Sequence, residues 1–398
     1  MTTSRMPRSA AGSLVALLLG LGAWAAPAAQ ATQSAAAAGK AAALPQASYK
    51  YTFSRIAWTG SRKVIAATDR RHDLYSFWEA SSSATWHKQL VAKGGSGTGY
   101  SAPSITWTGH AVAIAALDAS GDLLYFTQHS GSTTWKRSTV AKADGYPYQA
   151  PSVTTAGDGS VLISDGDIAN RLFSFTLAPD SSTWIRQWVS IGGLFGPSSI
   201  TTCYDSIVHA YLGLITATSG GTLYFWWERL DSPGWNQEII AASGPGGSFS
   251  GGSVAATNGA LLLTTATTTG SIDLWWQTIG GSAWNQQTVA AAGGGNWYTR
   301  PVVTWTGPVL GGSDSYDVLT AATGNGTLYY WWKLDGGSTW TRELVAKSGP
   351  LASYAIPAIA VNAKSVNITA INIKPGDVLF WFQPFGTNPW HRQTVAKG

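Results

Sequence analysis

A segment that starts with tryptophan recurs seven times along this chain and restricts the folds that the chain can adopt. Each copy begins with a tryptophan and continues in a related stretch, such as "WHKQLVA" in the first copy and "WTRELVA" in the sixth. Successive copies lie 49 to 56 residues apart. The seven tryptophans are Trp86, Trp135, Trp184, Trp235, Trp284, Trp340 and Trp390. Repeats of this period are typical of solenoids and propellers, in which each repeat is one supersecondary unit.

Two further columns of the repeat indicate a strand that is buried on both faces. Twelve residues before each tryptophan lies an aliphatic residue: Leu74, Leu123, Leu172, Leu223, Ile272, Leu328 and Val378. Nine residues before it lies an aromatic one: Phe77, Phe126, Phe175, Trp226, Trp275, Trp331 and Trp381. Because side chains alternate along a strand, positions three apart face opposite sides. We therefore expect this strand to lie between two neighbouring blades, with the aromatic column in the core.

Each repeat contains four short strand signals. In the second copy these are "APSITWT", "AVAIAAL", "DLLYFTQ" and "TWKRSTVA", separated by joins rich in Gly, Ser and Asp. No stretch of the mature chain shows helical periodicity. The sequence thus predicts an all-β fold, a seven-bladed β-propeller of four-stranded antiparallel blades. The recurring tryptophan, called here the closing tryptophan, follows a turn and is expected to seal the edge of its blade.

The N-terminus indicates export. Residues 1–31 contain Arg5 and Arg8, a short apolar stretch and a small-residue cleavage motif, as in a secretory signal peptide. Residues 32–48 are expected to be a flexible lead-in, and residues 49–398 form the propeller. No other long apolar run follows, so the sequence predicts a secreted protein without a membrane span. Charged residues are only 11% of the chain and form no basic patch, which argues against nucleic acid as a partner.

Two aromatic columns lie outside the expected core and are candidate ligand-binding positions. The first lies in the loops between blades, where an aromatic ring either staples adjacent blades or lines a groove between them. It consists of Tyr51, Tyr100, Tyr148, Phe195, Phe249, Tyr298 and Tyr354. The second lies eight residues before the closing tryptophan. It consists of Trp78, Trp227, Trp276 and Trp332, with Phe382 in the seventh copy and Thr127 and Thr176 in the second and third.

Rings with polar neighbours are a common way for proteins to hold sugars, because the C–H face of a pyranose stacks on the ring while its hydroxyls form hydrogen bonds. Such sites are weak, since a Kd of ~1 mM corresponds to about −4 kcal/mol. Several equivalent sites on one ring would offset that weakness through avidity. We therefore expect multiple weak glycan sites between blades.

The pattern P-x-x-x-W-T-G … G-x-L-Y-x-W-W … G-x-x-W resembles bacterial seven-bladed propeller lectins of the PLL type and, more distantly, the tectonin and fungal fucose-lectin propellers. The resemblance covers residues 49–398 and is best over Pro301–Ala346. It implies binding of fucose or O-methylated sugars in pockets between blades, without a metal or other cofactor. Two departures are units that end in "VA" rather than in a Gly-Gly turn, and the third copy, "RLFSFTLAPDSSTW", which lacks paired tryptophans.

An enzyme is the alternative interpretation. The fourth and sixth copies are longer than the second, and their extra residues bring Asp205 and His209 in one copy and Asp314 and Asp317 in the other. Two carboxylates from these loops would suit a glycosidase or lyase. A third interpretation is a protein-binding scaffold. The residues assign no catalytic group and no metal ligand, and they leave a homo-oligomer possible.

Overall fold

The computed structural model describes residues 51–80, 85–95, 99–205, 210–244, 248–294, 296–309 and 312–398. Contacts divide the chain into two units, Met1–Gln46 and Ala47–Gly398, and all described residues belong to the second. The expected signal peptide and lead-in lie outside the described residues. No helix among the described residues is long and apolar enough to cross a membrane.

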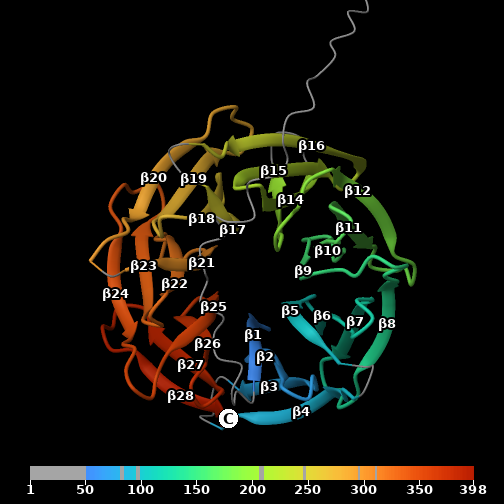
Figure 1. Cartoon of the computed structure of the whole chain (residues 1–398), viewed down its shortest axis with the longest axis horizontal. Helices are drawn as coiled ribbons and strands as arrows, with labels where there is room; N and C mark the ends of the chain where they lie inside the picture. The colour runs from blue at the N-terminus through green and yellow to red at the C-terminus, as the bar shows by residue number, and fades with distance from the viewer. Residues whose placement is uncertain are drawn as a thin grey trace, which may run out of the picture. The chain divides into compact units, whose positions relative to one another are not determined.

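The described residues form seven antiparallel four-stranded sheets, which confirms the predicted propeller (Figure 1). Blade 1 contains β1 (Tyr51–Trp58), β2 (Arg62–Asp69), β3 (Leu74–Ala80) and β4 (His87–Ala92). Blade 2 contains β5 (Ser101–Trp107), β6 (Ala111–Leu117), β7 (Leu123–His129) and β8 (Lys136–Ala141). Blade 3 contains β9 (Ser152–Thr155), β10 (Val161–Gly166), β11 (Arg171–Leu177) and β12 (Ile185–Ile191). Blade 4 contains β13 (Ser199–Asp205), β14 (Ala210–Ser219), β15 (Thr222–Arg229) and β16 (Ser232–Ala241).

The remaining three blades repeat this arrangement. Blade 5 contains β17 (Phe249–Ala256), β18 (Ala260–Thr267), β19 (Ile272–Thr278) and β20 (Asn285–Ala290). Blade 6 contains β21 (Tyr298–Trp305), β22 (Tyr316–Thr323), β23 (Leu328–Leu334) and β24 (Thr341–Ala346). Blade 7 contains β25 (Tyr354–Asn362), β26 (Ser365–Asn372), β27 (Asp377–Pro384) and β28 (His391–Ala396). The first strand of each blade lies toward the centre of the ring and the fourth at the rim (Figure 1).

The ring closes by packing between blades 1 and 7. Each blade is built from four consecutive strands, so no strand is shared between the terminal blades. Instead Ile65 and Phe77 of blade 1 share a core cluster with Ile371 and Phe380 of blade 7. The amide of Tyr51 also donates to the carbonyl of Gly376, at 3.3 Å. The first and last repeats therefore meet as any two neighbours do.

The third strand is buried on both faces, as its two columns predict. Leu74 packs in the cluster between blades 1 and 2, whereas Phe77 packs in the cluster between blades 7 and 1. The seven rings of the aromatic column are at most 3% exposed. Full burial of a large aromatic side chain stabilises a fold by about 1.5–3 kcal/mol, so this column is a main source of stability.

The closing tryptophans join each blade to the one before it, which confirms that they seal blade edges. Five of them donate a hydrogen bond from the indole Nε1 to a polar side chain of the preceding blade, over 2.8 to 3.2 Å. The pairs are Trp86–Gln393, Trp235–Ser174, Trp284–Glu238, Trp340–Gln287 and Trp390–Glu343. Trp184 packs edge-on against Tyr125 of blade 2 instead, with ring centroids 5.1 Å apart.

Candidate functional site

The aromatic column in the loops between blades is a set of packing residues in this structure. Six of its side chains are at most 6% exposed, and Phe249 is half-buried. Each ring packs edge-on against the third-strand aromatic of its own blade, as Tyr298 does against Trp331 at 5.3 Å. The other pairs are Tyr51–Phe77, Tyr100–Phe126, Tyr148–Phe175, Phe195–Trp226, Phe249–Trp275 and Tyr354–Trp381.

The same residues also link neighbouring blades through the backbone. The amide of Tyr100 donates to the carbonyl of His72, and that of Tyr298 donates to Gly270, each in a turn of the preceding blade. Of the two roles open to this column, the stapling role is therefore observed. Ligand binding by these rings stays a prediction, and the six buried rings expose little surface on which a sugar could stack.

The second aromatic column lies half-buried at the boundary with the next blade. Trp78, Trp227, Trp276 and Trp332 each pack against a core cluster shared with the following blade. Trp78 also stacks on His87, with ring centroids 5.4 Å apart and planes inclined by 20°. These rings fill the space between two blades and expose part of their surface there. Their contact with a ligand stays a prediction.

At the boundary between blades 2 and 3, no such ring is present and a cleft opens. Its volume is about 490 Å³. The half-buried Trp184 forms its aromatic surface, with the almost fully buried Tyr125 packed edge-on against it, and Leu177, Ala178 and Pro179 form an apolar wall. The polar groups that line it are Thr108, His110, Thr127, His129, Lys136, Arg137, Ser138, Ser181 and Ser182. We call this space the blade 2/3 cleft.

Three small or apolar residues coincide to open the blade 2/3 cleft. Thr127 lies where five other copies have Trp or Phe, and Ser138 lies where the other six have Gln or Glu. Leu177 lies where the other six have Glu, Gln or Lys. Thr127 and Ser138 come from blade 2, and Leu177 comes from blade 3. The side chains that would fill the boundary are therefore missing from both facing blades.

The boundary between blades 6 and 7 shows what usually fills this space. There Glu343 occupies the position of Ser138 and accepts three hydrogen bonds. Its Oε1 accepts one from the indole of Trp332 at 2.9 Å. Its Oε2 accepts one from Gln383 at 2.9 Å and one from Trp390 at 3.2 Å. This network occupies the volume that is empty between blades 2 and 3.

The blade 2/3 cleft combines aromatic surface with hydrogen-bond donors. Burial raises the pKa of Tyr125, so its phenol remains protonated at physiological pH. The imidazoles of His110 and His129 stack at 5.5 Å and are exposed to solvent. Lys136 and Arg137 add positive charge, and no carboxylate lines the cleft. The arrangement suits an uncharged or anionic ligand that is rich in hydroxyl groups.

This cleft was not predicted from the sequence, because the candidate positions are those at which aromatic residues recur in most copies. The columns of aromatic residues mark boundaries that are filled, whereas the open boundary is marked by the absence of those residues. The loss of a ring at Thr127 was visible in the sequence. Its meaning depended on Ser138 and Leu177, which lie on opposite walls.

Exposed aromatic residues on blade 3 form a second candidate surface. Tyr146 and Trp188 are each 48% exposed. The guanidinium of Arg171 lies 4.7 Å from the ring centroid of Tyr146 and 5.6 Å from that of Trp188, and it forms an ion pair with Asp167. We call this set of residues the blade 3 patch. Tyr146 lies two residues before Tyr148, the buried ring that the sequence pattern selects.

The carboxylates of the enzymatic alternative do not lie on one blade or on adjacent blades. Asp205 ends β13 in blade 4 and Asp317 lies in β22 of blade 6, with blade 5 between them in the ring. Asp317 is buried, which raises its pKa, and it forms an ion pair with Lys333 at 2.6 Å. Asp314 is exposed to solvent, and His209 lies outside the described residues. Among described residues, no three His, Cys, Asp or Glu side chains group together as metal ligands.

Comparisons with known proteins identify the fold. No protein-family model and no curated protein matches the sequence. Among solved structures, the BP39L lectin from Burkholderia pseudomallei has a TM-score of 0.66 at 16% identity, over 87% of this chain and 100% of that one. The Aleuria aurantia lectin, described as a six-bladed propeller with a fucose recognition mode, has a TM-score of 0.53 at 14% identity, over 87% and 97%. AofleA from Arthrobotrys oligospora has a TM-score of 0.51 at 12% identity, over 76% and 88%. The chain is therefore similar in fold to these solved proteins, two of which are lectins by name.

Proposed function

We propose that this protein binds carbohydrate and that the blade 2/3 cleft is its best-formed sugar site. The observation that carries the proposal is the pairing of Trp184 with hydroxyl, imidazole and guanidinium donors in an open cleft of about 490 Å³. Small-molecule sites commonly have volumes of roughly 300–1,000 Å³ and a few convergent polar groups on an apolar lining. The likeness in fold to solved propeller lectins supports the same function.

In this proposal the apolar C–H face of a pyranose lies against Trp184, and its hydroxyls bond to His129, Arg137 and Ser138. The wall formed by Leu177, Ala178 and Pro179 would receive a methyl group. We therefore propose terminal fucose or an O-methylated sugar as the ligand class. A single such contact surface would have a Kd of ~1 mM, or about −4 kcal/mol.

The number of sugar-binding sites depends on how many boundaries between blades have space for a sugar. The blade 6/7 boundary is filled by Glu343 and its partners, so seven equal sites are not supported. We propose the blade 3 patch, around Arg171, as a second and weaker site. Two sites on one ring engage a surface with many copies of a glycan, and their avidity can exceed either affinity by about 10²–10⁴. The stoichiometry in isothermal titration calorimetry measures this number directly.

The decisive experiment fills the cleft with the residues that other blades carry. A variant with Thr127→Trp and Ser138→Gln should fold normally and lose binding by at least about tenfold in Kd, because the added side chains occupy the sugar's place. A glycan array first identifies the ligand, and titration calorimetry then compares the variants. Ala363→Trp, which adds an indole at an exposed turn of blade 7, is the matched control and should bind as the unmodified protein does. Unchanged affinity in the double variant would remove the cleft from the proposal.

We also propose that the mature protein acts outside the cell, as residues 1–31 predict. Expression in a bacterial host with a general secretory pathway should place the protein in the exported fraction. The N-terminal sequence of that product should begin at Thr32. Retention of the full-length chain in the cytoplasm would contradict the proposal.

A further inference from the structure

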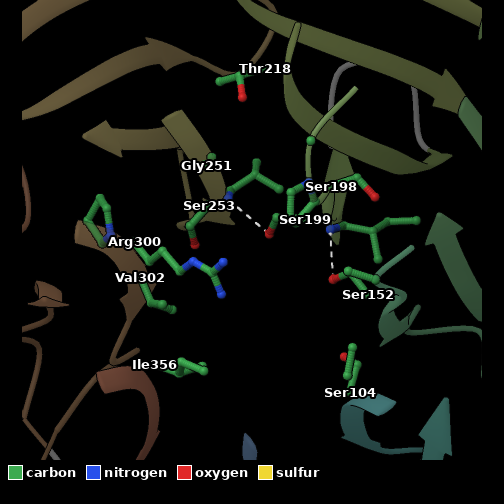
Figure 2. Close-up of a pocket in the computed structure, with 18 of the residues that line it drawn as sticks. Ser104, Ser152, Ser198, Ser199, Thr218, Gly251, Ser253, Arg300, Val302 and Ile356 are labelled. Carbon is green, nitrogen blue, oxygen red and sulfur yellow. Dashed lines mark hydrogen bonds between the residues drawn. The ribbon is translucent and has the colours of Figure 1, made fainter. Parts of the chain in front are cut away.

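A second cavity lies on the axis of the ring and is distinct from the blade 2/3 cleft. It has a volume of about 780 Å³ and is lined by residues from all seven blades, mainly from the innermost strands (Figure 2). We call it the axial channel. Its lining consists almost entirely of Ser, Thr, Gly, Pro and aliphatic residues. The two charged exceptions are Arg55 and Arg300.

Serine hydroxyls of blades 2 to 5 form a belt along part of the wall of the axial channel. Each serine accepts a hydrogen bond from a backbone amide of the following blade, over 3.1 to 3.3 Å. The pairs, named acceptor first, are Ser104–Val153, Ser152–Ile200, Ser199–Val254 and Ser253–Val303. A hydroxyl that accepts in this way keeps its proton to donate to another group.

Arg55 replaces serine in this belt. The strand register pairs Arg55 with Ala66 in blade 1, as it pairs Ser104 with Ala115 in blade 2. The guanidinium donates to the carbonyl of Ser54 at 3.1 Å, which uses one of its five N–H groups. The side chain forms no ion pair in the described structure. A guanidinium in the belt is therefore a feature of one blade and is not required by the fold.

Arg300 reaches the channel from a β-bulge in blade 6. Its φ is 45°, and three other bulge residues, Ala102, Gly251 and Ile356, have φ between 47° and 62°. The backbone geometry is thus common to several blades, while the charge belongs to blade 6 alone. Figure 2 shows the Arg300 guanidinium projecting into the open centre of the channel.

The two arginines have no counter-charge in the channel. Every Asp and Glu of the sequence lies in the described part of the chain, and none lines this cavity. Burial, together with the positive charge of Arg300, lowers the pKa of Arg55 to about 10. Two positive groups that line one cavity repel each other, and an anion bound between them removes that repulsion.

We propose that the axial channel binds a multiply charged oxyanion, a sulfate or phosphate group, between the guanidiniums of Arg55 and Arg300. The fork of N–H groups on arginine matches the oxygens of such an anion, and the serine hydroxyls supply further donors. The group is either a free ion or an ester on a sugar. The proposal does not depend on sugar binding in the blade 2/3 cleft.

The test uses the mature protein with sodium sulfate or sodium phosphate as the probe, against sodium chloride at equal ionic strength. Either oxyanion should raise the Tm in a saturable way, and crystals soaked in selenate should show anomalous density between Arg55 and Arg300. Arg300→Gln and Arg55→Gln should each weaken binding by at least about tenfold. Arg70→Gln removes an exposed charge that does not line the channel and should leave binding unchanged.

Arg300 is exposed, so its variant keeps the test decisive even if Arg55→Gln fails to fold. An equal response to sulfate in Arg300→Gln and the unmodified protein would overturn the proposal, as would selenate density only at other positions. A sugar 6-sulfate that binds more tightly than inorganic sulfate would identify an ester as the natural source. Equal or weaker binding would identify the free ion. The double variant Thr127→Trp, Ser138→Gln should bind sulfate normally, so that the two proposals fail separately.

Discussion

Asp165 should make the stability of this protein fall as pH rises through neutrality. The carboxylate is completely buried in β10 of blade 3. Its Oδ1 accepts hydrogen bonds from the amides of Gln149 and Ala150, at 3.3 and 2.9 Å, and its Oδ2 has no hydrogen-bond partner among the described residues. Burial raises its pKa from the usual 3.8 to about 7, against the opposing effect of the two amides.

The size of the effect follows from the two pKa values. Because the folded state holds the proton more tightly than the unfolded state, this group's contribution to stability is complete below pH 3.8. It is lost as pH rises through about 7. A difference of ~3 pKa units corresponds to about 4 kcal/mol, of which roughly 2–3 kcal/mol falls between pH 5 and pH 8. Asp165→Asn keeps an oxygen for both amides and cannot ionise.

Chemical denaturation followed by tryptophan fluorescence at pH 5, 6, 7 and 8 measures this difference. The difference in free energy of unfolding, Asp165→Asn minus the unmodified protein, should become more positive by roughly 2–3 kcal/mol from pH 5 to pH 8. Asp180→Asn, at an exposed position, should follow the unmodified protein. Parallel pH profiles for Asp165→Asn and the unmodified protein would contradict this prediction, because they would mean that the buried carboxyl does not titrate in this range.

Two further predictions concern the joints between and within blades. Glu343→Ala should lower the free energy of unfolding by about 2–3 kcal/mol, because three donors lose their shared acceptor. Glu343→Gln should lower it by less, and denaturation curves compare the two variants. Tyr298→Ala should cost about 3–5 kcal/mol by leaving a cavity beside Trp331, whereas Tyr298→Phe should stay within about 1 kcal/mol of the unmodified protein. If Tyr298→Ala instead left stability unchanged and abolished glycan binding, the ring would be a ligand contact and not a staple.

The architecture could be predicted from the repeat because, in every copy, both faces of the third strand carry apolar residues at the same positions. Leu74 and Phe77, three positions apart, necessarily face different neighbours, and only a wedge between two blades buries both. The closing tryptophans could be predicted for the same reason, since each copy must seal an equivalent edge. Because the seven copies share these columns, their third strands and closing tryptophans pack in the same way.

The loop aromatics show where this reasoning stops. A ring such as Tyr298, beside a Gly-rich loop, has the same local sequence whether it staples two blades or faces solvent. Its burial depends on the turn at Gly270 in the preceding blade and on the position of Trp331 in its own. Tyr146 and Tyr148 make the point within one loop, because one is half exposed and the other is buried.

The repeat alone predicts seven β-blades with aromatic cores, since the alternation of side chains along a strand needs no distant partner. Which boundary is open, and which charges face one cavity, depends on contacts between blades. The blade 2/3 cleft needs Thr127 and Ser138 on one wall and Leu177 on the other. The axial channel brings Arg55 of the first blade and Arg300 of the sixth into one cavity. The cleft depends on how two successive blades pack, whereas the channel depends on closure of the whole ring.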